Sequence, residues 1–273
     1  MYTTPRSRDL DPDLDPDPHL GPDPTSGVAS SATHAPLPSS VLPDIARGDA
    51  RLAVAARRTV RTPARQHAVA DAVLAIWRRE PWPAALLSVS CFTSSDGETV
   101  LTYTQWASED GYRAFTASSH AILTTGLDAF AHDVTRTDVV AYRLYRSGVP
   151  EATRHVVPGC FVFVSVQFDG PDERRQRQWV DTVFDALASE PEPPAGGLAG
   201  HFHLSVDGTR VLNYAEWIDE DAHRRALERS GQGAIGSSPK WREVRQFPGI
   251  VVAGFTRYRF HQGLAAPGHI NAA

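Results

Sequence analysis

The stretch VDGTRVLNYAEW, residues 206–217, decides the fold because the chain repeats it as SDGETVLTYTQW, residues 95–106. An ungapped alignment of residues 96–115 with 207–226 has nine identities in twenty positions. Each copy has an Asp-Gly pair followed by a short, mostly apolar run, which predicts a tight turn and the second strand of a β-hairpin. The repeated phrase therefore marks the same hairpin in two related parts of the chain.

The two copies differ at a polar position inside this strand, where residue 213 is Asn and residue 102 is Thr. Asparagine is a poor strand former. A buried amide without a hydrogen bond also costs about 1–3 kcal/mol. Asn213 therefore needs an explanation beyond strand formation.

The elements around the phrase follow the same order in both copies, strand-helix-strand-strand-helix-strand. The second copy predicts strands at 160–168, 197–205, 210–217 and 250–260, a helix within 171–190 and a helix from the N-cap residue Asp219. The first copy predicts a strand at 51–60, a helix at 63–79, a hairpin at 86–106, a helix from Ser108 and a strand at 138–146.

This order predicts an α+β fold in which tandem ferredoxin-like repeats form an intramolecular dimeric α+β barrel. A four-stranded sheet with helices on one face leaves its other face bare, and two such sheets can bury their bare faces by closing together. We expect a first repeat at 46–147, a linker at 148–158, a second repeat at 159–262 and a flexible C-terminus at 263–273. The internal pseudo-dimer implies a monomer or a weak homodimer.

Residues 1–45 hold nine of the 21 prolines and the acidic run DLDPDLDPDP. Such a segment has little apolar surface with which to offset its ordering entropy. The composition predicts a disordered acidic tail up to residue 45.

The composition of the 273 residues is that of a globular protein, with 41% hydrophobic residues and a net charge of −5. No basic stripe with aromatic residues predicts nucleic-acid binding. The apolar runs are of strand length and predict no membrane segment, and with no signal-like pattern we expect a cytoplasmic location. Cys91 and Cys160 have no CxxC spacing, which predicts two reduced thiols.

Three stretches of the second copy resemble the antibiotic biosynthesis monooxygenases, a family of dimeric α+β barrel enzymes from aromatic polyketide pathways. They are FVSVQFDGP (163–171), LSVDGTRVLNYAEW (204–217) and KWREVRQFPG (240–249). With the elements between them, these stretches cover about residues 159–260, and the first copy resembles the family more loosely over 50–147. The resemblance implies oxidation of a phenolic anthrone-type intermediate to a quinone by O2, with no metal or flavin cofactor.

The resemblance assigns the catalytic roles to Asn213, Trp217 and Arg242. Asn213 would donate its amide N–H to the substrate oxyanion or to a developing peroxide, an interaction typically worth about 3–4 kcal/mol of barrier. Trp217 would offer a stacking face, and Arg242 a permanent positive charge beside the enolate. The first copy has Thr102 in place of the Asn and no matching Arg, so we expect one active site per chain, in the second copy.

His203, His223 and Gln167 are candidate substrate-binding residues. His223 replaces a Tyr of the family and would accept a proton near neutral pH. The place of His203 depends on the hairpin register: a two-residue turn pairs Phe202 with Asn213, whereas a bulged loop pairs His201 with it and brings His203 near the substrate. Two histidines, His201 and His203, do not make a metal site, and none is predicted.

Each candidate also has a purely structural interpretation. Trp217 recurs as Trp106, which favours packing, while Arg242 and His223 would suit solvated helix faces. The competing function is a non-catalytic or cyclase-type barrel that binds an aromatic polyketide intermediate without oxygen chemistry. We expect Asn213, Trp217 and Arg242 to converge on one cavity in an oxygenase, and a cavity without Arg242 in a binding protein. A haem-degrading enzyme fits less well, since Leu227 and Thr116 occupy the position expected for a proximal His.

Overall fold

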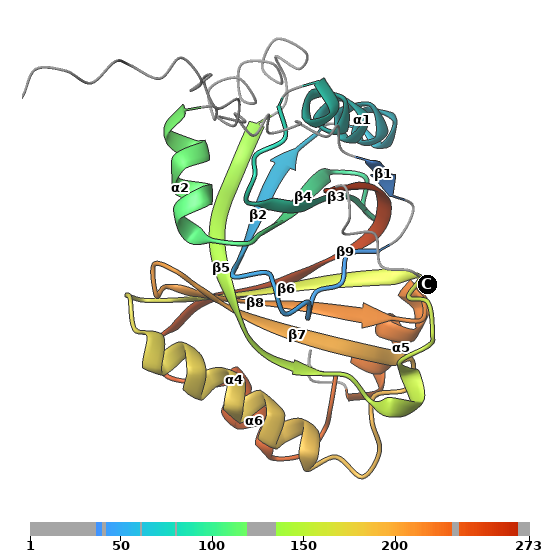
Figure 1. The fold of residues 1–273 in the computed structure, drawn as a ribbon. Helices are drawn as coiled ribbons and strands as arrows, with labels where there is room; N and C mark the ends of the chain where they lie inside the picture. The colour runs from blue at the N-terminus through green and yellow to red at the C-terminus, as the bar shows by residue number, and fades with distance from the viewer. Residues whose placement is uncertain are drawn as a thin grey trace, which may run out of the picture. The chain divides into compact units, whose positions relative to one another are not determined.

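Eight antiparallel strands close into a barrel in the computed structural model, with helices packed on its outside (Figure 1). The strands follow the order β9-β3-β4-β2-β5-β7-β8-β6, and a further pairing of β6 with β9 closes the ring. The structure describes residues 37–39, 42–60, 62–79, 81–118, 135–230 and 235–266; for 37–39 and 135–137 the backbone alone is described. This architecture confirms the predicted α+β barrel.

Two series of elements with the same order make up the barrel. The first half consists of β2 (Leu52–Thr59), α1 (Pro63–Arg79), β3 (Leu86–Ser94), β4 (Thr99–Trp106), α2 (Glu109–Ser118) and β5 (Thr135–Gly148). The second half consists of β6 (Cys160–Phe168), α4 (Glu173–Ala188), β7 (Gly197–Ser205), β8 (Arg210–Trp217), α5 (Glu220–Ser230), α6 (Lys240–Arg245) and β9 (Ile250–Ala265). A short 3-10 helix, η1 (Glu151–Thr153), lies between the halves.

Alternate residues of each strand face two different cores, as the pleat of a sheet requires. The barrel interior is filled mainly by aromatic and aliphatic residues of both halves, including Phe92, Tyr103, Phe163 and Tyr214. The opposite strand faces pack against α1 in the first half and against α4, α5 and α6 in the second. No helix among the described residues is long and apolar enough to cross a membrane.

The last strand of each half is longer than the sequence predicted. β5 runs on to Gly148 because it pairs with β7 of the other half, and β9 runs on to Ala265 because it pairs with β3. The predicted flexible C-terminus is therefore wrong at its start, since Leu264 is buried in the first-half core. Residues 267–273 lie outside the described residues.

The N-terminal tail is also shorter than predicted. β1 (Leu37–Ser39) pairs with the end of β9, and Ile45 is buried in the barrel interior. A few apolar residues are enough to hold this proline-rich segment, although its average composition is that of a disordered chain. The rest of the predicted tail, residues 1–36, lies outside the described residues.

A buried carboxyl group occupies the barrel interior beside these aromatic residues. Glu216 of β8 pairs with Phe161, and burial followed by the charge of Asp44 raises its pKa from 4.5 to about 7. The matching position of the first half is Gln105, whose amide donates to the carbonyl oxygen of Asp44 at 2.8 Å. The neutral side chain is thus accommodated in one half and the ionisable one in the other.

We predict that Glu216→Gln stabilises the protein at alkaline pH and has little effect below pH 4.5. A pKa raised by folding means that ionisation opposes the fold, so the penalty grows from the unfolded pKa of 4.5 to the folded pKa of about 7 and is constant above it. Urea denaturation at pH 4.5 and pH 8 measures this, with an expected gain on the order of 1–3 kcal/mol at pH 8 only. An equal change at both pH values would contradict the raised pKa.

Candidate functional site

The hairpin of β7 and β8 turns Asn213 towards the helices. Its register pairs Phe202 with Asn213, and on the other side Asn213 pairs with Val164. Phe202 packs in the core under α4, whereas the flanking residues Leu212 and Tyr214 belong to the barrel interior. Asn213 therefore lies on the helix-facing side of the sheet and not between the two sheets.

The Asn213 amide makes no hydrogen bond to any described residue, and its Oδ1 atom is buried. In the first half the matching Thr102 is satisfied, since its Oγ1 accepts a hydrogen bond from Arg58 at 3.2 Å. An unpaired buried polar atom costs about 1–3 kcal/mol. Asn213 is therefore the kind of group that a bound ligand would satisfy.

Trp217 lies on the same face and is buried beneath α5. Its ring packs against Ala222 and Ala226 of α5 and contacts His223, with ring centroids 4.9 Å apart. The matching Trp106 donates its indole N–H to Thr104 at 2.9 Å, but Ala215 replaces Thr104 in the second half. The indole N–H of Trp217 consequently has no acceptor among the described residues, so packing accounts for the ring but not for a paired N–H.

A cation reaches this face from β9. Arg257 pairs with Val162, which places it on the same sheet face as Asn213 and Trp217. Its Nε atom donates to Nδ1 of His223 at 2.9 Å, and its guanidinium carbon lies 5.1 Å from the ring centroid of Phe255. Phe255 in turn contacts His223, with centroids 5.1 Å apart. These contacts fix a guanidinium charge beside an aromatic surface.

His223 is a neutral hydrogen-bond donor in this arrangement. Burial, followed by the positive charge of Arg257, lowers its pKa from 6.5 to about 4. Its Nδ1 accepts from Arg257, so the proton of the neutral ring sits on Nε2. The predicted role of proton acceptor near neutral pH does not fit, because the acceptor nitrogen is already engaged. The structural alternative, an exposed helix position, is wrong as well, because His223 is only 3% exposed.

Arg242 does not join the other two predicted catalytic residues. On the short helix α6, Trp241 and Val244 are the buried residues that pack against α4, while Arg242 is exposed. The helical period turns the side chain of Arg242 away from the sheet. The positive charge expected from the resemblance is therefore not at residue 242, and Arg257 holds the position beside Asn213's sheet face.

His203 and Gln167 lie on the opposite sheet face. The Phe202–Asn213 register turns His203 into the barrel, where its Nδ1 donates to the carbonyl oxygen of His201 and its Nε2 accepts from Tyr103, both at 3.0 Å. Burial lowers the pKa of His203 to about 3. Gln167 pairs with Arg210 and also faces the barrel. Neither residue can contact a ligand that sits over Asn213.

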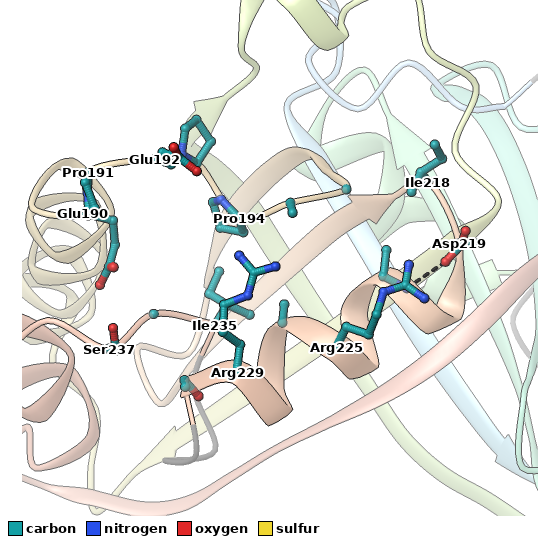
Figure 2. Close-up of a pocket in the computed structure, with 17 residues that line it drawn as sticks. Glu190, Pro191, Glu192, Pro194, Ile218, Asp219, Arg225, Arg229, Ile235 and Ser237 are labelled. Carbon is teal, nitrogen blue, oxygen red and sulfur yellow. Dashed lines mark hydrogen bonds between the residues drawn. The ribbon is translucent and has the colours of Figure 1, made fainter.

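A pocket of about 480 Å³ opens between α5 and the proline-rich loop before β7 (Figure 2). Figure 2 shows Arg225 and Arg229 projecting from α5 along one side, with Glu190 and Glu192 on the loop opposite. Ile235 lines the pocket and also packs against both apolar clusters of the second half, which contain Phe202 and Trp217. The pocket thus adjoins the helix-facing surface that carries Asn213, although Asn213 itself does not line it.

The sequence contained a signal for Arg257 that the alignment missed. The registers match Arg257 to Ala141 and Phe255 to Val139, so both are polar or bulky replacements on the last strand of the second half. The ungapped alignment stopped at residue 226, well before this strand. Comparing the last strands of the two copies would have identified the cation.

The sequence matches no protein-family model and no curated protein. A solved structure described as an anthrone oxidase-like protein aligns with a TM-score of 0.62 and 17% identity, covering 83% of this chain and 98% of that chain. A proposed monooxygenase from Fusobacterium nucleatum aligns at 0.48 and 8% identity over 81% and 97% of the two chains. A ferredoxin-fold protein from Listeria monocytogenes, described as related to antibiotic biosynthesis monooxygenases, aligns at 0.39 and 10% identity over 78% and 96%. The first match shows a shared fold.

We predict that Arg257→Gln raises the pKa of His223 from about 4 towards, but not up to, 6.5. The substitution removes a like charge and a hydrogen bond to the neutral ring, both of which disfavour protonation, while burial continues to hold the pKa down. Titration of the histidine ring resonances by NMR measures the shift. Arg242→Gln is the matched control and should leave His223 unchanged. An unchanged pKa in Arg257→Gln would mean that the two side chains do not interact.

Proposed function

We propose that the second half is a monooxygenase site that oxidises a phenolic anthrone-type substrate to a quinone with O2. The observation that carries this proposal is the difference between the two halves on one sheet face. Where the first half pairs its polar groups internally, the second half presents the Asn213 amide and the Trp217 indole N–H without acceptors or donors of its own. A preorganised pair of donors is what a reacting oxyanion requires.

Arg257 supplies the charge that the reaction needs. A phenolic anthrone is weakly acidic, and a fixed guanidinium cannot be deprotonated, so it stabilises the substrate anion without acting as a base. Its neighbours His223 and Phe255 exclude water from one side of the guanidinium, which strengthens its electrostatic effect. Because His223 is neutral and already accepts from Arg257, the proton leaves the acidified substrate to solvent.

The reaction balances without a cofactor. The substrate CH2 loses one proton to give a carbanion, which transfers an electron to O2, and the resulting radicals combine as a peroxide. Loss of the second hydrogen with hydroxide yields the carbonyl, so one oxygen atom enters the quinone and the other leaves as water. The protein has to hold the ring system, stabilise the anion and shield it. The fold shared with an anthrone oxidase-like protein agrees with this class of reaction.

The rival proposal is a barrel that binds an aromatic molecule without oxidising it. The exposed position of Arg242 favours this rival, because convergence of that residue with Asn213 was the feature expected of an oxygenase. The presence of Arg257 on the correct sheet face weighs against it, since the charge is available from another strand. Turnover, and not binding, distinguishes the two.

We predict that the chelator-treated protein converts dithranol, a simple anthrone, to its quinone in air at a rate well above the uncatalysed one. Asn213→Ala should lower kcat by about 10²–10³-fold, as is typical of a lost oxyanion donor. Arg257→Gln should lower kcat/KM by at least tenfold, while Arg242→Gln should change it less than twofold. Oxygen uptake and quinone absorbance give both constants.

The variants also separate the alternatives. If Arg242→Gln abolished turnover and Arg257→Gln did not, the cation would be the residue that the sequence suggested. If dithranol bound to the protein without any oxygen uptake, the binding role would replace the oxygenase. Thermal unfolding of each variant shows whether a lost rate reflects lost folding.

A further inference from the structure

The barrel interior opens to the outside at a cavity of about 280 Å³, which we call the barrel mouth. It lies on the opposite sheet face from Asn213, so it is distinct from the site above. Residues of both halves line it, and the argument below uses Arg57, Asp138, Tyr142, Gln167, Arg210 and Gly254. None of these belongs to the predicted catalytic set.

The lining consists largely of positions that match between the halves. Tyr142 matches Tyr258 and Leu101 matches Leu212, as the strand registers show. The mouth therefore surrounds the internal pseudo-two-fold axis of the barrel. A cavity at such a position has two similar walls, and differences in the remaining pairs determine what it can bind.

Those differences concentrate positive charge. Arg57 of the first half matches the neutral Ser165, and Arg210 of the second half matches the neutral Thr99. Arg210 forms an ion pair with Asp138, but its Nε atom is buried and has no partner among the described residues. Two guanidinium groups and one carboxylate leave the mouth with a net charge of about +1.

The depth of the mouth is aromatic and aliphatic with few hydrogen-bonding groups. Phe163, Leu101 and Leu212 line it, and Tyr142 is buried beside them. Neither the Tyr142 hydroxyl nor the Gln167 amide has a hydrogen-bond partner within the part of the chain that the structure describes. Burial raises the pKa of Tyr142, so its hydroxyl keeps its proton and can donate.

We propose that the barrel mouth binds a small aromatic carboxylate of one or two rings. The ring would enter between the apolar walls, and the carboxylate would stay near Arg57 and the unpaired Nε of Arg210. Ligand cavities typically measure about 300–1,000 Å³, so a cavity of about 280 Å³ suits a molecule near the lower limit. A larger, fused-ring polyketide does not fit there. The proposal is independent of the oxygenase activity.

The probe is 1-naphthoate, titrated into the full chain by isothermal calorimetry, with 1-naphthamide as its uncharged analogue. We expect naphthoate to bind and the amide to bind at least tenfold more weakly, since charge-assisted hydrogen bonds contribute about 1.5–3 kcal/mol. Arg57→Gln should weaken naphthoate binding by about tenfold. Arg259→Gln removes a similar charge from exposed β9 and is the matched control, with no expected change.

Gly254→Phe tests the location by filling the mouth. A Cβ atom at Gly254 would meet nothing within 4 Å, so the phenyl ring should enter the opening without disturbing the barrel. We expect this variant to keep its melting temperature and lose naphthoate binding. Binding that survives Gly254→Phe but is lost in Asn213→Ala would place the ligand at the helix-facing site and overturn the proposal. The absence of any naphthoate binding to the wild-type protein would overturn it too.

Discussion

The pairing of Phe202 with Asn213 fixes the chemistry of both faces of the second sheet. Because side chains alternate along a strand, a slip of one residue would exchange everything that faces the helices with everything that faces the barrel. The observed pairing sends Asn213 and Trp217 outward and sends His203, Tyr214 and Glu216 inward. The residues that face the barrel satisfy apolar packing or each other, and those that face the helices include the unpaired amide.

The strands could be predicted closely because their signals are local. The Asp-Gly turn and the alternating run after it place β7, β8 and the first-half hairpin within a residue or two of their observed bounds. The lengths of β5 and β9 could not be read in this way, since their final residues are held by strands of the other half. A strand end that depends on a distant partner carries no local signal.

The site could be predicted only in part for a related physical reason. Asn213 and Trp217 lie four residues apart on one strand, so period two alone places them on one face. Arg242 and Arg257 could not be ranked, because the choice between them depends on the rotation of a six-residue helix and on the order of strands in the sheet. The neutral state of His223 likewise follows from its burial against Trp217 and Phe255, which no sequence period indicates.

A barrel made by one chain differs from a barrel made by two identical subunits in what a single replacement does. In a symmetric pair, an arginine at the axis would face its own copy, and the repulsion would limit how much charge the opening could hold. Here Arg57 looks across to Ser165, and Asp138 occupies the position that matches Gly254. Covalent fusion therefore allows the axis of the molecule to carry a directional electric field, which strict symmetry would cancel in the plane perpendicular to that axis.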